Sequence, residues 1–328
     1  MPPLLKIENL RIELTTRDGV APVIDDLSLE LNAGDTLSFV GESGCGKSMT
    51  ALGIMGLLPE KVGRIASGTV MFNGENLTKA SDVRLREIRG NDISMIFQEP
   101  MTSLNPVFTI GEQIAEVLRR HQNLGKNAAW NKAIELLDAV RIPNPKARAS
   151  YYPHQMSGGQ RQRVMIAIAL ACEPKILIAD EPTTALDVTV QAQIFDLLRG
   201  LGRETGTATI LITHDMGSVA EMAEHMIVMY AGRKVEDGPV EQIIRRPRHP
   251  YTKGLISCVP HLMATLTDDR PELTEIGGIV PSLREFGHDK CLFASRCDLA
   301  DDKCRSKRPP ELHFNSEQSS ACWHAKEL

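Results

Sequence analysis

A glycine-rich loop near the start of the chain constrains the fold more than any other feature of the sequence. The residues Gly41-Glu-Ser-Gly-Cys-Gly46-Lys47-Ser48 fit the pattern G-x-x-x-x-G-K-S. An apolar run over 36–40 predicts a buried strand before the loop, and apolar residues over 47–58 predict a helix after it, ended by Pro59. Glycines let backbone N–H groups face an anion, and the helix N-terminus adds positive potential. The pattern therefore predicts a phosphate-binding loop in an α/β fold.

The side chains of this loop predict a nucleoside triphosphate bound together with Mg²⁺. We expect Lys47 to contact the β- and γ-phosphates and the Ser48 hydroxyl to bind Mg²⁺. The alternative is a plain glycine turn in front of a helix. The other expected nucleotide contacts are Gly41, Ser43, Gly44, Cys45, Gly46 and Met49.

Composition excludes several classes of protein. The chain has 328 residues, which favours about two domains. Its 42% hydrophobic and 24% charged residues are ordinary for a globular protein, and its net charge of −5 gives no overall electrostatic case for binding nucleic acid. The longest dense apolar run, 164–172, is shorter than the ~20 residues of a membrane-spanning helix. No secretory signal is apparent at the start, so we expect a cytosolic chain that can still dock on a membrane protein.

Two adjacent acids follow the apolar run 175–179, which predicts a strand in the middle of a parallel sheet. Open α/β sheets bind ligands at the carboxyl ends of their strands. We therefore expect Asp180 to hold Mg²⁺ through water and Glu181 to polarise an attacking water molecule. The alternative for this pair is two solvated acids that end a strand.

A third motif makes the pattern specific. Ser157-Gly-Gly-Gln160 precedes a helix predicted over 161–171 and lies about twenty residues ahead of Asp180. It resembles the signature motif of ATP-binding cassette (ABC) ATPases. Gln98 resembles that family's Q-loop glutamine, 185–187 its D-loop and His214 its switch histidine, and the resemblance covers residues 1–240. It implies an α/β fold with a P-loop NTPase (RecA-like) core, an antiparallel β subdomain and a helical signature subdomain.

The resemblance also implies roles for these residues. Two cassettes of this family pair head to tail, so that each ATP lies between the P-loop of one and the signature loop of the other. Gln98 would then contact Mg²⁺ or the attacking water, and His214 the γ-phosphate. Where the family usually stacks adenine on an aromatic residue, this chain has Arg17, whose guanidinium plane could take that place or be a solvated charge. The signature residues that would face the partner's ATP are Ser157, Gly158, Gly159 and Gln160.

Two further stretches resemble the peptide-importer branch of the family. They are 98–106 after the Q-loop glutamine and His249-Pro-Tyr-Thr252 near the start of a C-terminal extension. We predict a nucleotide-binding domain over 1–245, with its helical subdomain at about 99–172, and an extension over 246–328. The implied function is ATP hydrolysis that energises import of dipeptides or oligopeptides, by a peripheral subunit on the cytoplasmic face of the cell membrane. The implied partners are a second ABC ATPase subunit, expected to be a paralogue, two transmembrane permease subunits and an extracytoplasmic solute-binding protein.

Other interpretations remain open at this point. Importers of nickel chelates, glutathione or opines fit the same branch. A soluble ABC ATPase acting on nucleic acid is a rival, but such chains interrupt the cassette with very long coiled coils. Here only about sixty residues separate Gln98 from Ser157, without a heptad repeat. A non-hydrolysing iron–sulfur module built on a cassette scaffold is a second rival, against which Glu181 and His214 argue.

Four of the seven cysteines crowd the end of the chain, with five, six and seventeen residues between them. Four thiolates can enclose one ion or cluster, but zinc sites usually include a close C-x₂₋₄-C pair, which this spacing lacks. The resemblance to the peptide-importer branch implies a [4Fe–4S] cluster, with Zn²⁺ or free thiols as alternatives. A structural role is expected, because the proline-rich tail has few apolar residues for a core of its own. The four are Cys291, Cys297, Cys304 and Cys322.

Overall fold

A computed structural model describes residues 2–17, 19–98, 103–183, 188–259, 275–286, 289–315 and 317–328. The chain forms two compact units, each described by itself below. Unit 1 comprises 1–4, 31–36 and 79–212, and unit 2 comprises 5–30, 37–78 and 213–328. Both units combine segments that are distant in the sequence. The predicted division of the chain at residue 245 stays a prediction, because the units follow contacts rather than chain order.

Three parallel strands form the sheet of unit 1. β7 (Ile176–Asp180) lies between β6 (Ile93–Ile96) and β8 (Ala208–Thr213). Every residue of the three strands is buried, as expected for parallel strands covered on both faces. Parallel strands bring their carboxyl ends to one edge. The residues that follow β6 and β7 therefore meet at the same edge of this sheet.

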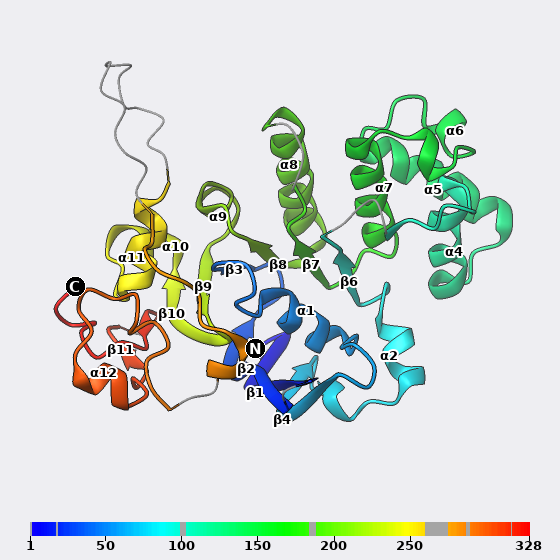
Figure 1. Ribbon diagram of the computed structural model, residues 1–328. Coiled ribbons are helices and arrows are strands. Elements are labelled where there is room, and N and C mark those ends of the chain that lie inside the picture. Colours follow the sequence, from blue (N-terminus) through cyan, green and yellow to red (C-terminus); the bar gives the residue numbers. More distant parts are fainter. Residues whose placement is uncertain are drawn as a thin grey trace, which may run out of the picture. The chain divides into compact units, whose positions relative to one another are not determined.

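Helices make up the rest of unit 1. The side chains of Ile110, Ile114 and Leu118 in α4 are fully buried, and their spacing of four residues places them on one face. α4 packs on α5, and α7 contacts both (Figure 1). The spacing of apolar residues in the sequence predicts helices over 110–121 and 128–140, and α4 and α5 confirm them. The helices are α2 (Asp82–Ile88), α4 (Ile110–Gln122), α5 (Lys126–Ala139), α6 (Pro145–Arg148), α7 (Gly158–Leu170) and α8 (Val188–Thr205), with the 3₁₀ turn η2 (Pro153–Gln155).

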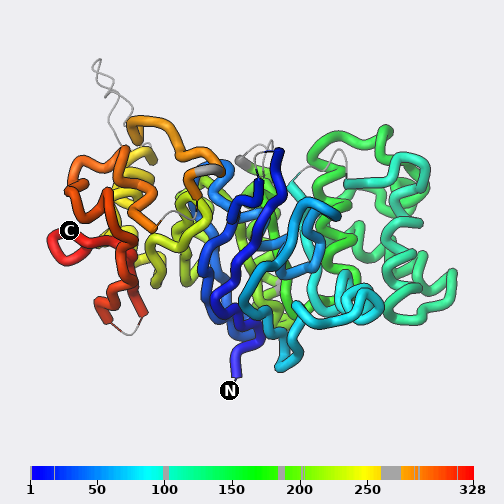
Figure 2. Tube along the Cα trace, turned by 60° about the horizontal axis from the view of Figure 1, so that its bottom comes forward, coloured from blue at the N-terminus to red at the C-terminus, as the bar shows by residue number. Residues whose placement is uncertain are grey.

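An antiparallel sheet forms one part of unit 2 (Figure 2). Its strand order is β2-β1-β4-β5, and β1 pairs with β4 in antiparallel register from Leu5↔Phe72 to Leu14↔Gly63. Near-alternating apolar residues over 4–14 and 27–31 predict strands, and these lie in β1 and in the last part of β2. β4 was not predicted, because Ser67 and Gly68 interrupt its apolar residues. The elements are β1 (Leu5–Thr16), β2 (Gly19–Leu31), β4 (Gly63–Phe72), β5 (Glu75–Asn76) and η1 (Leu77–Lys79).

The other part of unit 2 is built on β9 (His225–Tyr230). β9 pairs in parallel with β3 (Thr36–Val40) and in antiparallel with β10 (Arg233–Pro239). The end of the chain continues this sheet, with β12 beside β10 and β11 beside β12 (Figure 2). The remaining elements are α1 (Lys47–Met55), α9 (Met216–Met222), α10 (Val240–Arg245), α11 (Pro250–Ser257), η3 (Leu283–Glu285), α12 (Asp302–Ser306), β11 (Leu312–His313) and β12 (Ser319–Ser320).

Aromatic side chains join the C-terminal extension to β9. The ring of Tyr230 lies 4.7 Å from that of Tyr251 and 5.2 Å from that of Phe293, centroid to centroid. All three side chains are at least 95% buried. Such pairs are worth more than their buried area alone. The extension therefore does not build a separate core but shares one with β9 and β10.

A buried carboxylate strengthens this junction. Glu236 in β10 is completely buried, and its two carboxylate oxygens accept hydrogen bonds from the backbone N–H groups of Arg248 (2.7 Å) and His249 (3.0 Å). Burial raises the pKa of Glu236 despite these hydrogen bonds. His249 is also buried, which lowers its pKa to about 3, so its neutral ring can accept the N–H of Tyr251 at the start of α11.

We expect Phe293→Ala to lower the free energy of unfolding of unit 2 by about 3–5 kcal/mol, because it leaves a cavity in the shared aromatic core. Denaturant titration followed by tryptophan fluorescence measures this loss. Phe108→Ala is the matched control, since that ring is 48% exposed and its removal should cost far less. Equal losses in the two variants would contradict the shared core.

Candidate functional site

The phosphate-binding loop between β3 and α1 needs glycine at two positions for reasons that the structure makes explicit. Gly41 has a φ of 151°, and a Cβ on it would lie 2.2 Å from the carbonyl oxygen of Met229. Gly46 has a φ of 104°, and its Cβ would lie 2.8 Å from the carbonyl oxygen of Val23. Both contacts are too close for any side chain. The backbone of β2 and β9 thus sets the path of the loop.

Lys47 is held inside this loop. Its Nζ donates hydrogen bonds to the carbonyl oxygens of Gly41 (2.7 Å) and Glu42 (3.1 Å), and the residue is only 6% exposed. Both acceptors are neutral, so they orient the ammonium without cancelling its charge. A buried, oriented positive charge in a glycine-rich loop is suited to phosphate oxygens.

The other residues of the loop differ in their solvent exposure. Ser43 and Gly44 are exposed at its tip, whereas Ser48 and Met49 are half-buried in the first turn of α1. Cys45 is buried, and burial raises the pKa of its thiol. That environment keeps Cys45 protonated and unreactive. The predicted helix over 47–58 ends earlier, at Met55, because Gly56 adopts a left-handed conformation with a φ of 60°.

In unit 1 the structure brings Gln98 and Glu181 together, as the strand order predicts. The Gln98 side-chain amide donates a 3.0 Å hydrogen bond to the Glu181 carboxylate. Glu181 follows Asp180, the buried last residue of β7, and has a left-handed φ of 47°. That conformation is uncommon outside glycine, and here the Glu181 N–H donates to the carbonyl oxygen of Ile212 (2.8 Å). β8 thus fixes the turn that orients the carboxylate.

The motif 157–160 begins helix α7 with a reciprocal cap. Ser157 Oγ accepts the Gln160 N–H (3.3 Å), and the Gln160 side chain accepts the Ser157 N–H (3.1 Å). Ser157 and Gly158 are exposed, and Gly159 is half-buried. A Cβ on Gly158 would meet no atom of this chain within 4 Å. Packing within the described chain therefore does not explain why this position is glycine.

His214 is exposed in unit 2, directly before α9. The next residue, Asp215, caps that helix by accepting the N–H groups of Gly217 and Ser218, both at 3.0 Å. Burial raises the pKa of Asp215, but these hydrogen bonds and one from the Ser218 hydroxyl outweigh it and hold the pKa below its usual value. The cap fixes the backbone that presents His214.

Arg17 is exposed in the turn after β1, where its stacking role stays a prediction. The predicted D-loop, 185–187, lies outside the described residues, as do 99–102 of the stretch 98–106. The loop with Lys47 belongs to unit 2, and Gln98, Asp180 and Glu181 belong to unit 1.

The four clustered cysteines converge in unit 2, where they line one small cavity. Burial, together with the other cysteines, raises the pKa of Cys291 to about 11 and that of Cys322 to about 12. Backbone N–H groups approach all four sulfurs, among them His324 N at 3.4 Å from Cys322 Sγ. Converging buried sulfurs with N–H donors are typical of a metal or cluster site, where bound cations compensate thiolate charge.

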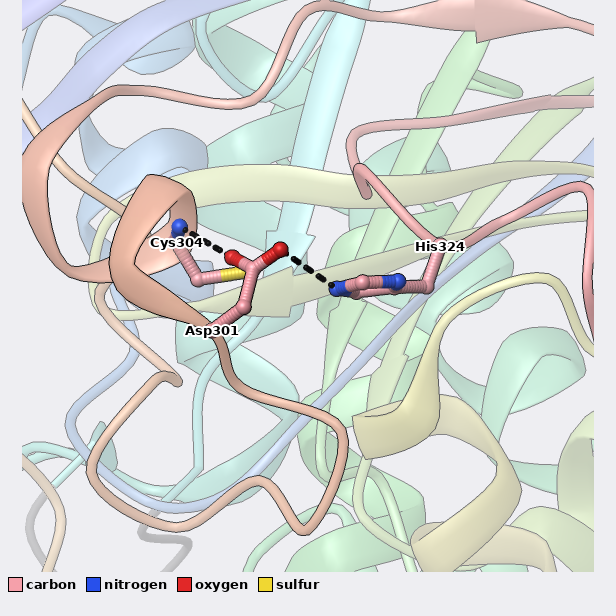
Figure 3. Close-up of side chains that lie close together, drawn as sticks. All are labelled: Asp301, Cys304 and His324. Carbon is pink, nitrogen blue, oxygen red and sulfur yellow. Dashed lines mark hydrogen bonds and ion pairs between the residues drawn. The ribbon is translucent and has the colours of Figure 1, made fainter.

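A mixed group of side chains of metal-binding type includes one of these cysteines, Cys304 (Figure 3). One ligand atom each of Asp301, Cys304 and His324 lies within 4.8 Å of the others. The Asp301 carboxylate accepts the Cys304 N–H at 2.8 Å and lies 3.5 Å from His324 Nε2. Asp301 thus has interaction partners within the protein. His324 was not predicted from the sequence.

Sequence reasoning also missed a contact of the loop itself. Glu42 occupies a variable position of the loop pattern, and the structure pairs its carboxylate with Arg296. Tyr251 lies in the motif 249–252 but was assigned no role. No local pattern marks Arg296, because its partner is 254 positions away.

Comparison with known proteins identifies the family. The family "ABC transporter" matches residues 24–184, and "Oligopeptide/dipeptide transporter, C-terminal region" matches 235–304. The chain is 48% identical to the oligopeptide transport ATP-binding protein OppD of Haemophilus influenzae, with 100% of this chain and 99% of that one covered. It is 46% identical to the dipeptide transport ATP-binding protein DppD of Bacillus subtilis, with 98% and 95% covered.

Solved structures agree on the fold. The dimeric ATP-binding cassette MJ0796, bound to ADP and Pi, is 29% identical with a TM-score of 0.65, covering 72% of this chain and 98% of that one. CbiO1 of Clostridium perfringens is 26% identical with a TM-score of 0.62, covering 75% and 92%. The predicted P-loop NTPase fold is confirmed.

The chain belongs to the ABC transporter family, as an ATP-binding subunit of the oligopeptide/dipeptide importer type. It is an ATPase of that family, as the motifs predict. In the part of the chain that the structure describes, no helix has the length and apolar character of a membrane span.

We expect Gly41→Ala to weaken ATP binding about ten- to a hundredfold, because its Cβ forces the loop away from Met229 at about 1–3 kcal/mol. Titration of the full chain with a fluorescent ATP analogue measures this. Gly158→Ala is the matched control, since its Cβ enters open space and should leave ATP binding by the single chain unchanged. Wild-type affinity in Gly41→Ala would show that the loop tolerates a side chain there.

Proposed function

We propose that this chain hydrolyses ATP to energise the import of dipeptides or oligopeptides across the cytoplasmic membrane. Relatives named as oligopeptide and dipeptide transport ATP-binding proteins, similar over nearly the whole chain, support the substrate class. The hydrogen bond between Gln98 and Glu181 is the structural observation that carries the catalytic part. It orients a half-buried carboxylate at the edge of the unit 1 sheet, where α/β proteins bind ligands.

The chemistry assigns a role to each residue. Lys47 and the N–H groups of the loop would bind the β- and γ-phosphates. Ser48, Asp180 and Gln98 would hold Mg²⁺, which would neutralise charge on the transferred phosphoryl group. Glu181 accepts a proton from the attacking water, and His214 contacts the γ-phosphate.

The signature motif serves a second molecule. Gly158 is exposed and meets no atom of its own chain at its Cβ position, and the N-terminus of α7 offers N–H groups to an anion. We propose that Ser157, Gly158 and Gly159 contact the ATP bound by a paired cassette. The dimeric cassette to which this chain is similar supports such pairing.

The proposed assembly contains a second ATPase subunit, most simply a paralogue, two transmembrane permease subunits and an extracytoplasmic solute-binding protein. The chain would lie peripherally on the cytoplasmic face of the membrane. The match over 235–304 supports a C-terminal extension. We place its start after residue 245, where the nucleotide-binding domain ends.

Glu181→Gln is expected to lower ATP turnover about a hundred- to ten-thousandfold, because a neutral amide cannot take the proton of the attacking water. ATP binding should persist, so that ATP traps the paired cassettes. Phosphate release by the reconstituted transporter and size-exclusion chromatography with ATP measure the two effects. Undiminished turnover would remove the catalytic assignment of Glu181.

We further propose that Cys291, Cys297, Cys304 and Cys322 hold a [4Fe–4S] cluster with a structural role. Zinc is the less suitable occupant, because Zn–S bonds of about 2.3 Å require sulfurs about 3.8 Å apart. In the described residues, the one group with all ligand atoms within 4.8 Å includes only one of these cysteines. Sulfurs spaced around a cavity, with N–H donors, suit a larger group.

Anaerobically purified protein should contain iron and acid-labile sulfide in equal amounts and absorb broadly in the visible range. Cys322→Ser should lose both elements, because it removes a thiolate from the site. Cys172→Ser is the matched control, as Cys172 lies outside the cavity. Stoichiometric zinc without sulfide in the wild-type protein would exclude the cluster.

A further inference from the structure

An ion pair connects the cysteine-bearing extension to the phosphate-binding loop within unit 2. Arg296 lies directly before Cys297, and its two terminal nitrogens lie 2.7 and 2.9 Å from the two carboxylate oxygens of Glu42. The pair is therefore bidentate, which is the strongest geometry for arginine and carboxylate. The Arg296 side chain is only 2% exposed, so solvent screens this pair little.

The guanidinium is fixed by the extension itself. A guanidinium has five N–H donors. Two go to Glu42, and the other three go to the backbone carbonyls of Gly277 (2.8 Å) and Ile276 (3.0 Å) and to the Tyr230 hydroxyl (3.3 Å). With all five donors used, Arg296 has one defined orientation.

The extension also holds the backbone of Glu42. The Glu42 N–H donates a 2.8 Å hydrogen bond to the hydroxyl of Tyr251, which is completely buried in α11. Side chain and backbone of this loop residue are thus both anchored by the extension. The Glu42 carbonyl in turn accepts a hydrogen bond from Lys47 (3.1 Å), which connects the anchor to the phosphate-binding ammonium.

Charge gives the ion pair a second effect. A carboxylate inside an anion-binding loop opposes a triphosphate, and it does so more strongly where solvent is excluded. Arg296 balances the charge of Glu42 at contact distance. Loss of Arg296 would both release the loop backbone and leave a negative charge beside the phosphates.

We propose that Arg296 is a positioning residue for the phosphate-binding loop, which it organises through Glu42 so that the folded extension sets the affinity for ATP. This inference rests on the proposed function, since it concerns the same ATP site. Arg296 contacts neither Glu181, which is assigned to the attacking water, nor His214, which is assigned to the γ-phosphate, and it reaches the phosphates only through the loop that binds them. Its loss should therefore raise the KM for ATP and leave kcat nearly unchanged.

To test this, the full chain is purified with its cysteine site occupied and is titrated with MgATP. ATP turnover is then measured in the reconstituted transporter. Arg296→Gln should raise the Kd and KM for ATP about tenfold or more, with kcat within about twofold of wild type. Arg308→Gln is the matched control. It removes the same charge from the extension, but its partners are Asp25 and Asp26, outside the loop, so ATP affinity should stay at the wild-type value.

A double variant separates positioning from a general loss of structure. In Glu42→Gln/Arg296→Gln both charges are gone, so the affinity for ATP should recover most of the loss. Arg296→Lys keeps the charge without the bidentate geometry and should fall between wild type and Arg296→Gln. If circular dichroism shows that Arg296→Gln does not fold, the ATP affinity of Arg296→Lys tests the inference instead.

Wild-type ATP affinity in Arg296→Gln, an equal loss in Arg308→Gln, or a double variant no better than the single would each overturn the inference. These results would leave the proposed function intact. Conversely, a wild-type chain that binds MgATP but does not energise peptide uptake would remove the proposed function, while the variant titrations still decide the role of Arg296.

Discussion

The confinement of one positive charge, the ammonium of Lys47, is the interaction on which the rest of this structure depends. Two loop carbonyls hold it, and those carbonyls are correctly placed only because Gly41 and Gly46 pass where no side chain fits. The backbone of β2 and β9 creates that constraint. Strands β2 and β9, from the two sheets of unit 2, therefore act as a rigid template for an anion-binding loop, as expected of a site built on regular elements.

The extension contributes more than the sequence suggested. It shares the aromatic core of β9, adds two short strands beyond β10 and reaches the loop through Arg296 and Tyr251. A tail that is poor in apolar residues gains stability by packing on an existing core rather than forming one. Its four cysteines line one cavity, and Cys297 directly follows Arg296 in the chain. The proposed role of Arg296 thus links the folding of the C-terminal extension to the affinity of the phosphate-binding loop for nucleotide.

Several elements were predictable because their signals are local. β7 and β8 are short, continuous apolar runs, α4 has apolar residues spaced by four, and Ser157 with Gln160 forms a capping box readable from spacing alone. β4 was missed because Ser67 and Gly68 interrupt its apolar residues. The early end of α1 was not predicted, because Gly56 in a left-handed conformation, and not Pro59, ends the helix.

By itself, the sequence determined the family, the order of the motifs and the residue types proposed to bind phosphate and to activate water, since each of these depends on near neighbours in the chain. Only the tertiary structure decided that Gln98 meets Glu181, that four cysteines surround one cavity and that Arg296 pairs with Glu42. The two contacts join residues 83 and 254 positions apart. Their geometry is set by strand order and by packing in three dimensions, which no periodicity along the chain records.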